Sequence, residues 1–295
     1  MKLGIGLPNT MAHEIDRKLM LDWARLADQA GFDVLGTIDK PNFDSWDPLV
    51  TLAGVALVTE RARLATSILV LPARHEVLVA KQAAVVDQLS GGRLVLGLAQ
   101  GGREDDFELF DVAEDFARRS SKFERQVNHI REVWRKSRES DHDRGVVGPP
   151  PVQDPGPPIW SGALSEKAIE RAARVADGFI FGTTGAEFMK QTTPKVREAF
   201  AAQGKHEIEV AGLAYVAVGD DAQAALEEGA HHVVRYYGEL WTEPENLIHH
   251  GAATKIAEEV QAYAGSGIDT LILFAEIPRL DQVEQLAEHV LPAYR

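Results

Sequence analysis

Two glycine pairs are the first residues that could do chemistry, and both lie in the segment DQLSGGRLVLGLAQGG, residues 87 to 102. Gly91 and Gly92 separate a stretch of helical period from a strand-like apolar run, so we expect them to end the helix in the left-handed conformation. Gly101 and Gly102 follow the run. Glycine at such a position lets backbone amides approach a bound planar or anionic group closely. We predict that the second pair lines a ligand site.

Small residues also precede an alanine-rich helical stretch in WSGALSEKAIERAA, which begins at Trp160. Ser161, Gly162 and Ser165 lie at its start, and Ser165 is a typical helix N-cap. A helix N-terminus preceded by small residues can bind an anion such as a phosphate. Plain helix capping is the alternative interpretation. The later segment FGTTGAE, residues 181 to 187, could reach the same anion.

Polar residues interrupt or end two other apolar runs. Asp39 and Lys40 are adjacent in IDKPN, where a surface ion pair is the alternative to a functional role. Thr66 and Ser67 open the segment TSILVLPARH. Buried hydroxyl groups need hydrogen-bond partners, so these two residues are candidates for facing a polar ligand. His75 ends the same segment and is a candidate proton carrier.

Other kinds of site have little support in the sequence. The histidine pairs at 231–232 and 249–250 lack a carboxylate spacing such as H-E-x-x-H, so a metal site is not predicted. Ala99 occupies the second glycine position of G-x-G-x-x-G, and the acidic REDDFE that follows would repel a pyrophosphate. No G-x-S-x-G motif is present, and the absence of cysteine excludes thiolate nucleophiles and disulfides.

The composition is that of an ordinary globular protein, with 45% hydrophobic and 26% charged residues among 295. A net charge of −14 without a basic cluster opposes binding to nucleic acid or to anionic membranes. No apolar stretch approaches the roughly 20 residues that span a bilayer. The N-terminal MKLGIGLPNT lacks the features of a signal peptide. We therefore expect a cytoplasmic protein without a nucleic-acid or membrane partner.

The candidate residues must be positioned by elements that alternate along the chain. Short runs rich in Val, Ile and Leu alternate with longer stretches of helical period, which is typical of βα units around a parallel sheet. Eight such strands predict a (β/α)8 TIM barrel with its active site at the C-terminal strand ends. The expected strands are 3–7, 34–38, 64–71, 94–99, 158–161, 178–181, 210–218 and 270–274. The expected helices are 14–30, 46–60, 76–89, 122–136, 165–176, 187–202, 222–236, 254–265 and 281–291.

Two stretches exceed the minimal βα unit and predict insertions, one after strand 4 and one before strand 8. Residues 103–158 contain an acidic segment, a helix and GVVGPPPVQDPGPP, where proline favours stiff, extended chain. Residues 237–253 form the second insertion. We expect both near the upper rim of the barrel. An active-site cover and a solvated surface insertion are the alternatives, and residues 1–295 are expected to form a single domain.

Two segments resemble the bacterial luciferase-like flavin-dependent oxidoreductases, a family that includes enzymes of the deazaflavin F420. They are residues 24–102 and PPIWSGALSEKAIERAARVADGFIFG. The resemblance implies that reduced FMN or F420 lies across the C-terminal strand ends. It implies a bulge in the third strand, often with a non-proline cis peptide, that supports the isoalloxazine ring, and Ser67 and Ile68 match that position. It also implies that a phosphate site is formed by Gly162, Ala163, Leu164 and Ser165.

Two positions depart from the pattern of the relatives. Gln100 stands where some flavin-using relatives have a phosphate-binding arginine, and Lys40 stands where many have a histidine tied to proton handling. Lysine at its ordinary pKa of about 10.4 is a poor base near neutral pH. The proton chemistry therefore falls to His75 or to a desolvated Lys40, or else Lys40 neutralises the anionic reduced cofactor. We favour the last of these roles.

These considerations together predict Lys40 and His75 as the catalytic residues. The predicted cofactor-binding residues are Asp39, Thr66, Ser67, Ile68, Gln100, Gly101, Gly102, Ser161, Gly162, Ala163, Leu164 and Ser165. The expected activity is monooxygenation of a small organic substrate with reduced FMN and O2. FMN is preferred because no basic strip is evident for the charged tail of F420. F420-dependent hydride transfer and a non-catalytic flavin-binding protein are the alternatives, and the resemblance implies a homodimer that could receive reduced flavin from a separate reductase.

Overall fold

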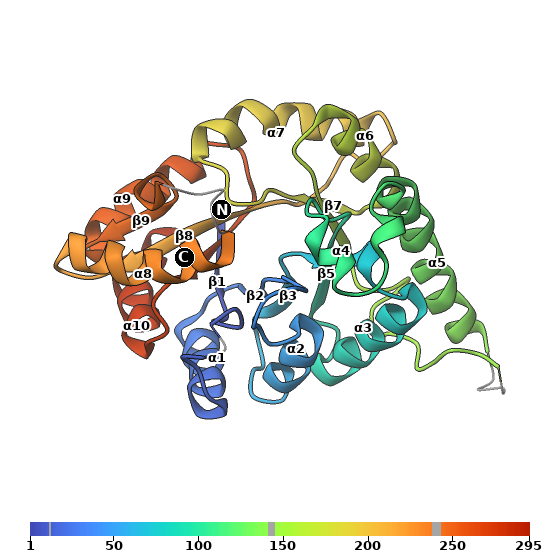
Figure 1. Cartoon of the computed structure of the whole chain (residues 1–295), viewed down its shortest axis with the longest axis horizontal. Coiled ribbons are helices and arrows are strands. Elements are labelled where there is room, and N and C mark those ends of the chain that lie inside the picture. The colour runs from blue at the N-terminus through green and yellow to red at the C-terminus, as the bar shows by residue number, and fades with distance from the viewer. Residues whose placement is uncertain (12, 141–144, 238–242) are drawn as a thin grey trace.

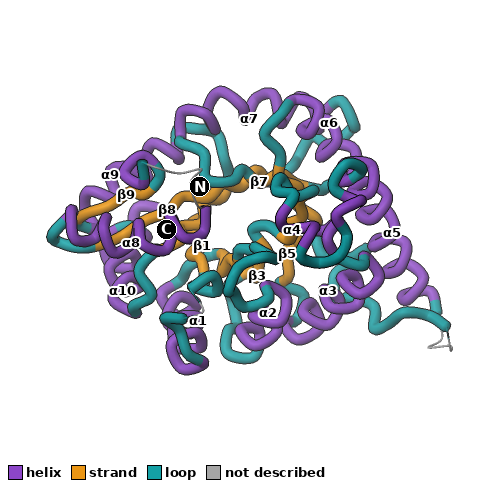
Figure 2. The backbone as a smooth tube through the Cα atoms, in the orientation of Figure 1, coloured by secondary structure: helices purple, strands orange, loops and turns teal. Residues whose placement is uncertain are grey.

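Parallel strands close on themselves into a barrel, as Figure 1 and Figure 2 show for the computed structural model, which describes residues 1–11, 13–140, 145–237 and 243–295. The strand β10 pairs in parallel with both β1 and β8, and this double pairing closes the sheet. The (β/α)8 prediction is confirmed. The barrel strands are β1 (Lys2–Gly6), β2 (Val34–Thr37), β3 (Arg63–Thr66), β5 (Leu94–Ala99), β6 (Ile159–Gly162), β7 (Gly178–Ile180), β8 (Val210–Val218) and β10 (Thr270–Ala275).

A ring of helices surrounds the barrel, each helix packing against the next and the last against the first. The capping residues explain where several of them begin and end. The Asp16 carboxylate accepts a hydrogen bond from the Leu19 amide at 2.7 Å, and Gly91 ends another helix at φ 66° in the predicted left-handed conformation. The ring consists of α1 (Arg17–Ala30), α2 (Pro48–Ala56), α3 (Glu76–Ser90), α5 (Arg119–Glu139), α6 (Glu166–Val175), α7 (Ala186–Ala201), α9 (Ala253–Ala264) and α10 (Leu280–His289).

Two described helices stand outside this ring. They are α4 (Asp105–Glu108), which follows β5, and α8 (Ala222–Tyr237), which follows β8. After α8 comes a strand that the sequence did not predict, β9 (Ile248–Gly251), which pairs in parallel with the upper part of β8. The second insertion therefore begins at α8 rather than at residue 237, and α9 is the true ring helix of this βα unit.

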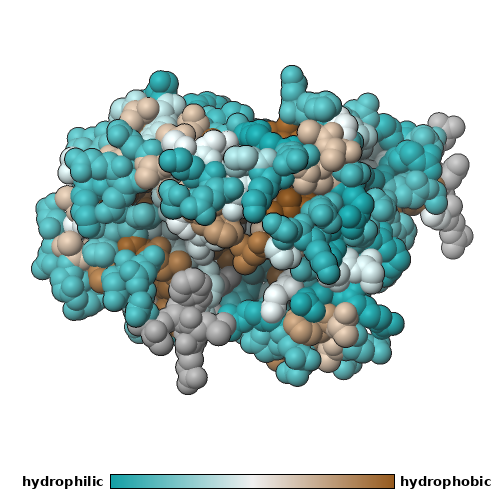
Figure 3. Space-filling model, turned by 90° about the horizontal axis from the view of Figure 1, so that it is seen from above, coloured by the Kyte–Doolittle hydropathy of each residue, from teal (hydrophilic) through white to brown (hydrophobic). Residues whose placement is uncertain are grey.

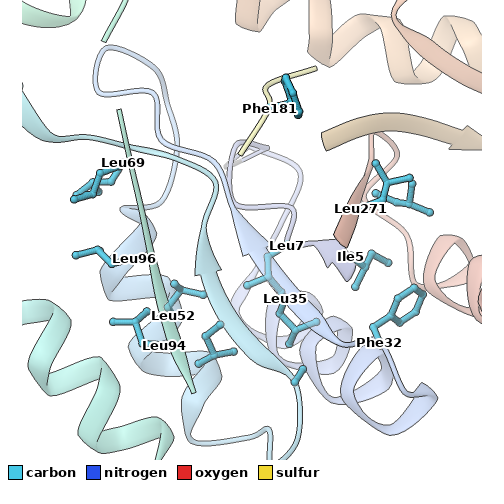
Figure 4. Packing of buried hydrophobic residues seen from close by; sticks show 14 of the residues in the cluster. Ile5, Leu7, Phe32, Leu35, Leu52, Leu69, Leu94, Leu96, Phe181 and Leu271 are labelled. Atoms are coloured by element: carbon cyan, nitrogen blue, oxygen red, sulfur yellow. The ribbon is translucent and has the colours of Figure 1, made fainter. Parts of the chain in front are cut away.

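The core has two parts, because alternate residues of each strand face opposite sides of the sheet. Outward-facing Leu and Ile side chains such as Ile5, Leu35 and Leu96 pack beneath the helices (Figure 4). Inward-facing residues such as Trp160 and Phe274 fill the barrel itself. The outer surface is mainly hydrophilic, with apolar residues gathered where the face seen in Figure 3 is hollowed. No helix among the described residues combines the length and hydrophobicity needed to cross a membrane.

The expected strand 64–71 is wrong in its length. The structure divides it into β3, a break at residues 67 and 68, the two-residue strand β4 (Leu69–Val70) and a 3-10 helix (Leu71–Ala73). The peptide bond between Ser67 and Ile68 is cis, as the family resemblance implies for a bulge at this place. An uninterrupted apolar run hides the break, because hydrophobicity does not distinguish a straight strand from a bulged one.

The expected position of the proline-rich segment is also wrong. The Gln153 side chain donates to the carbonyl of Leu94, the first residue of β5, at 2.8 Å, and the Gln153 amide donates to the Asp87 carboxylate at 2.9 Å. These contacts place the segment at the N-terminal ends of the strands, opposite the predicted active site. The reason is that α5 runs from one end of the barrel to the other, so only residues 103–118 remain at the upper rim.

Candidate functional site

The bulge at Ser67 and Ile68 fills space that two glycines leave open inside the barrel. A Cβ atom on Gly97 would lie 1.9 Å from the Thr66 carbonyl oxygen, and one on Gly162 would lie 2.4 Å from Cδ1 of Ile68. Only glycine at these positions lets the bulge approach β5 and β6 so closely. The predicted bulge residues are thus brought together with Gly162, one of the predicted phosphate-site residues.

The two hydroxyl groups near the bulge have different roles. Thr66 Oγ1 donates to the Gly97 carbonyl at 2.7 Å inside the sheet, so this hydroxyl already has a partner within the protein. Ser67 Oγ is buried and has no protein hydrogen-bond partner. A buried hydroxyl without a partner is costly and calls for an explanation, and a bound polar ligand atom would supply one. Ser67 therefore remains the better candidate for contact with a cofactor.

Asp39 lies behind the bulge in a buried ion pair with Arg74. The guanidinium donates to both carboxylate oxygens, at 2.7 and 2.9 Å, and the Val70 amide donates to the same carboxylate at 2.8 Å. Burial raises the pKa of Asp39 to about 6 even though Arg74 opposes this shift. The pair ties the end of β2 to β4. Asp39 therefore supports the bulge together with Arg74, a residue that was not predicted for the site from the sequence.

The two predicted catalytic residues occupy different surroundings. The Lys40 side chain is buried, with Nζ 5.3 Å from the centre of the Phe43 ring. Burial, followed by the charge of Arg103, lowers the pKa of Lys40, and Asp106 opposes the shift. His75 is exposed and caps α3, where its Nδ1 accepts the Val77 amide at 3.3 Å. Helix capping accounts for His75, so Lys40 is the better candidate of the two.

The start of α6 has the features of an anion site. Ser165 is the N-cap residue in extended conformation, but its side chain makes no capping hydrogen bond. The first amides of α6 therefore do not donate a hydrogen bond to the Ser165 hydroxyl, the group that would ordinarily cap them. Gln100, at the end of β5, accepts from Arg171 of α6 at 3.1 Å and from Ser120 at 2.7 Å. Arg171 thus brings a guanidinium to Gln100, and its Nε also lies 3.3 Å from the Glu124 carboxylate. Arg171 was not among the residues predicted from the sequence.

The residues of the predicted phosphate site run from the end of β6 to the start of α6. Ser161 is buried at 3% exposure within β6, whereas Leu164 is 66% exposed just before the N-cap. Ala163 is half-buried and packs against the outer core. Of the four residues that the resemblance assigns to phosphate, Gly162 lies against the bulge at Ile68 and Ser165 is the exposed N-cap of α6.

The two glycines of the second pair, Gly101 and Gly102, differ in their surroundings. Gly101 has φ 77°, and a Cβ on it would lie 2.9 Å from both the Phe107 ring and Val70. Glycine is therefore required at position 101 by the left-handed backbone conformation and by the close packing of α4. Gly102 has open space where a Cβ would be. Of the pair, Gly102 is the residue beside open space, whereas Gly101 lies against Phe107 and Val70.

The short helix α4 covers the adjoining part of the rim. Phe107 is fully buried in a small cluster with Val70, and Asn42 Nδ2 donates to the Asp105 carboxylate at 2.5 Å. Asp106 Oδ1 is buried without a hydrogen-bond partner, and burial raises the pKa of this carboxyl. Helix α4 thus joins the loop after β2 to the loop after β5, above the bulge.

These features fit a flavin with a terminal phosphate. The unpartnered Ser67 Oγ and the apolar Ile68 could contact a planar heteroaromatic ring, while the uncapped start of α6 and the Arg171 guanidinium could contact an anion. Gly162 links the two features, since it lies against Ile68 and precedes α6 by only a few residues. The described residues therefore offer both parts of an FMN site in one continuous stretch of the rim.

The family model of luciferase-like monooxygenases matches residues 1–273. The FMNH2-dependent dimethylsulfone monooxygenase of Pseudomonas putida is 26% identical, with 96% of this chain and 88% of that protein covered. The oxygenase component of flavin-dependent trigonelline monooxygenase from Acinetobacter baylyi is also 26% identical, over 81% of this chain and 70% of that protein.

Solved structures show the same fold at lower identity. A monooxygenase of Streptomyces bottropensis superposes with a TM-score of 0.81 at 23% identity, with both chains fully covered. An F420-dependent secondary alcohol dehydrogenase in complex with an F420–acetone adduct gives 0.78 at 18% identity, over 100% of this chain and 99% of that one. Together with the family match over residues 1–273, the barrel and its bulge establish that the chain belongs to the luciferase-like monooxygenase family.

Proposed function

We propose that this protein is a flavin-dependent monooxygenase that binds reduced FMN across the mouth of the barrel and oxygenates a small organic substrate. The observation that carries the proposal is the unpartnered Ser67 hydroxyl next to Ile68, which itself lies against Gly162 a few residues before the uncapped N-terminus of α6. The names of the two curated relatives, one FMNH2-dependent and one flavin-dependent, support the same cofactor class. Bound reduced FMN would supply the electrons that activate O2.

Different residues of the rim bind the ring and the phosphate of the cofactor. Ile68 supports one face of the ring, and Ser67 Oγ exchanges a hydrogen bond with a polar atom at its edge. Gly162, Ser165 and the first amides of α6 hold the phosphate, and Arg171, which also pairs with Glu124, offers guanidinium donors on the same side. The arrangement keeps the ring in one position while the substrate approaches the opposite face.

Lys40 acts on the ring by its charge. A cation near a reduced, deprotonated flavin stabilises the negative charge of that flavin. Burial lowers the pKa of Lys40, which also brings this ammonium closer to proton exchange at neutral pH. The Asp39–Arg74 pair fixes the backbone just before Lys40 and at β4, so it sets the distance between the cation and the bulge.

The insertion after β5 has a part in excluding water. Helix α4 and the following residues up to 118 cover the rim beside the bulge, held by the Phe107 cluster and by the contact of Asn42 with Asp105. A covered site protects reactive reduced flavin from solvent. We assign the cover to residues 103–118 alone, within one domain formed by residues 1–295.

An apolar face on α2 and α3 supports assembly as a homodimer. Val50 and Leu57 are 65% and 69% exposed at α2, and Leu78 of the adjacent α3 is 56% exposed. Such a patch on packed helices is typical of a protein interface. A second copy is the proposed occupant because a two-fold axis buries the same patch on both chains.

The proposal also covers the source of the reduced flavin and the cellular location of the protein. The barrel uses its one C-terminal face for the flavin and the substrate, and the name of the Acinetobacter relative describes an oxygenase component. We therefore propose that a separate flavin reductase supplies reduced FMN. A cytoplasmic location follows from the need for that reductase and its nicotinamide donor.

The test is a parallel titration of the purified protein with FMN and F420, each oxidised and reduced, followed by calorimetry. We expect reduced FMN to bind more tightly than F420 because the rim offers one anion site at α6. Tighter binding of F420 would support hydride transfer instead and would overturn the monooxygenase proposal. Tight FMN binding without oxygen-dependent turnover for any substrate would identify a non-catalytic flavin-binding protein.

A further inference from the structure

Arg103 lies on the loop that leaves β5 at the C-terminal end of the strand, the end that carries the active site in this fold. It follows Gly102, where a Cβ atom would meet nothing within 4 Å. The Gly101 carbonyl accepts a hydrogen bond from Arg119 Nε at 3.1 Å, and the chain after Arg103 continues into α4. Phe107 of α4 is fully buried. The backbone on both sides of Arg103 is therefore fixed, and it places this residue at the mouth of the barrel beside open space.

The Arg103 guanidinium has donors to spare. Its side chain is 30% exposed, and in the part of the chain that the structure describes its one polar contact joins Nε to the Asp105 carboxylate at 3.5 Å. That carboxylate already accepts a hydrogen bond from Asn42 Nδ2 at 2.5 Å. A guanidinium has five N–H donors, so most of those of Arg103 lack an acceptor among the described residues. Arg103 can therefore bind a further group that accepts hydrogen bonds.

The charge of Arg103 acts on groups from three segments of the rim. Burial lowers the pKa of Lys40 in the loop after β2, and the like charge of Arg103 lowers it further. Burial raises the pKa of Asp106 on α4, and Arg103 opposes that shift. At Tyr237, the last residue of α8, burial again raises the pKa and Arg103 opposes the shift. Since a charge shifts a pKa only over a short distance, the guanidinium lies near all three groups.

The neighbourhood of Arg103 favours an anion. Arg103 and Lys40 carry like charges that repel one another, and a bound anion would relieve this repulsion. The two acidic residues of α4 relieve it only in part. The Asp105 side chain is 51% exposed and shares its carboxylate with Asn42, and Asp106 Oδ1 is buried without a hydrogen-bond partner. Because Lys40 is assigned to the charge of the reduced flavin, the Arg103 guanidinium stays available to a substrate.

We propose that Arg103 binds a carboxylate group of the organic substrate through two parallel N–H···O hydrogen bonds. This inference rests on the proposed function, because the bound substrate must meet the exposed face of the flavin. A planar carboxylate matches the fork of a guanidinium, whereas the ammonium of Lys40 offers only a point charge. The substrate class is therefore an organic carboxylate, and its anionic end is directed toward the β5–α4 side of the mouth.

The test compares benzoate with benzamide, two planar molecules of similar size that differ in charge. Ligand-observed NMR titrations of the full chain, with and without FMN and at about 0.15 M salt, give the ratio of the two affinities. The net charge of −14 disfavours benzoate at other surfaces, so a preference for it reports a local cation. We expect the wild type with FMN bound to prefer benzoate about tenfold, the value of one charge-assisted hydrogen bond.

Variants of Arg103 separate its role from that of other cations. Arg103→Gln removes the charge and should bring the ratio to about one while FMN affinity is retained. Arg103→Lys restores a positive charge without the planar fork, so it should recover part of the preference. The matched control is Arg118→Gln, because Arg118 Nη2 also lies 3.5 Å from a carboxylate, that of Asp115, and its side chain is 65% exposed. We expect this control to retain the wild-type ratio.

The outcomes distinguish this inference from the proposed function. A wild-type ratio near one would overturn the inference, and so would an unchanged ratio in Arg103→Gln or in Arg103→Met, which is measured beside it in case one of the two variants fails to fold. FMN binding without a preference for benzoate would overturn the inference alone. A preference that depends on Arg103, in a protein that does not bind FMN, would uphold the carboxylate site and overturn the proposed function.

Discussion

The contact between Gly162 and Ile68 gives the sharpest test of how the flavin platform is built. The Gly162→Ala variant places a methyl group 2.4 Å from Cδ1 of Ile68, whereas carbon atoms in contact are ordinarily about 3.5–4.0 Å apart. The side chain of Ile68 must therefore move by more than about 1 Å. Overpacking of this kind costs about 1–3 kcal/mol of unfolding free energy. We also expect weaker FMN binding, because we propose that Ile68 supports the ring.

The rescue follows from the same geometry. Ile68→Val removes the atom that clashes and by itself costs about 0.5–1.5 kcal/mol. If the clash is the whole defect, the double variant should cost no more than Ile68→Val alone, about 0.5–1.5 kcal/mol, so the interaction energy is about −1 to −3 kcal/mol. Urea unfolding of the four proteins measures this energy. FMN titration of the same samples should show partial recovery in the double variant.

If Gly162→Ala and Ile68→Val lower the free energy of unfolding additively, the proposed contact between these two residues is refuted. The matched control is Gly54→Ala in α2, where a Cβ meets nothing within 4 Å. That substitution should stabilise the helix by about 0.5–1 kcal/mol and show no coupling to Ile68→Val. If Gly54→Ala couples to Ile68→Val as strongly as Gly162→Ala does, the cycle is reporting something other than the contact at the bulge.

Four further outcomes are expected. Ser165→Asp should weaken FMN binding at least about tenfold, because a carboxylate would face the phosphate; unchanged affinity in calorimetry would remove the phosphate assignment. Lys40→Met should lower the turnover number more than FMN affinity, and a fully active variant would exclude a role for this cation. The folded pKa of Asp39, about 6, exceeds its unfolded value, so its contribution to stability is present below about pH 4 and lost as pH rises through about 6. Relative to Asp39→Asn, the wild type should lose up to about 3 kcal/mol over that range in urea unfolding, and parallel pH profiles would contradict the assignment. Leu57→Glu should shift sedimentation toward the monomer, and an unchanged mass would remove α2 from the interface.

The sequence predicted the barrel because the features that specify it are local and periodic. Each strand is a short apolar run, and Gly91 marks the end of a helix by a conformation that only glycine adopts easily. Ser165 was found for the same reason, since a small polar residue before a helical stretch is a local signal. The order of these signals along the chain is sufficient to place Gly162 and Ser165 at the C-terminal strand ends.

Residues that act across the fold gave no such signal. Arg171 appears in the sequence as one more charged residue on a helix, and only the place of α6 in the fold brings it to Gln100, just after β5. Arg74 was visible at the end of an apolar run, but its buried contact with Asp39 depends on the break after β3. A pairing between residues far apart in the chain leaves no trace in the periodicity of either segment.

Helix α8 shows that a helix can be predicted correctly from the sequence while its place in the fold is predicted wrongly. Its residues have the amphipathic period of a ring helix, because any helix that buries one face has that period. The period cannot tell which surface receives the apolar face. In this chain, Gly229 allows α8 to approach Ala217 closely, and His232 finds its partner after β10, so the helix lies over the mouth instead of beside the strands. The barrel then obtains its ring helix from α9, which packs between α7 and α10.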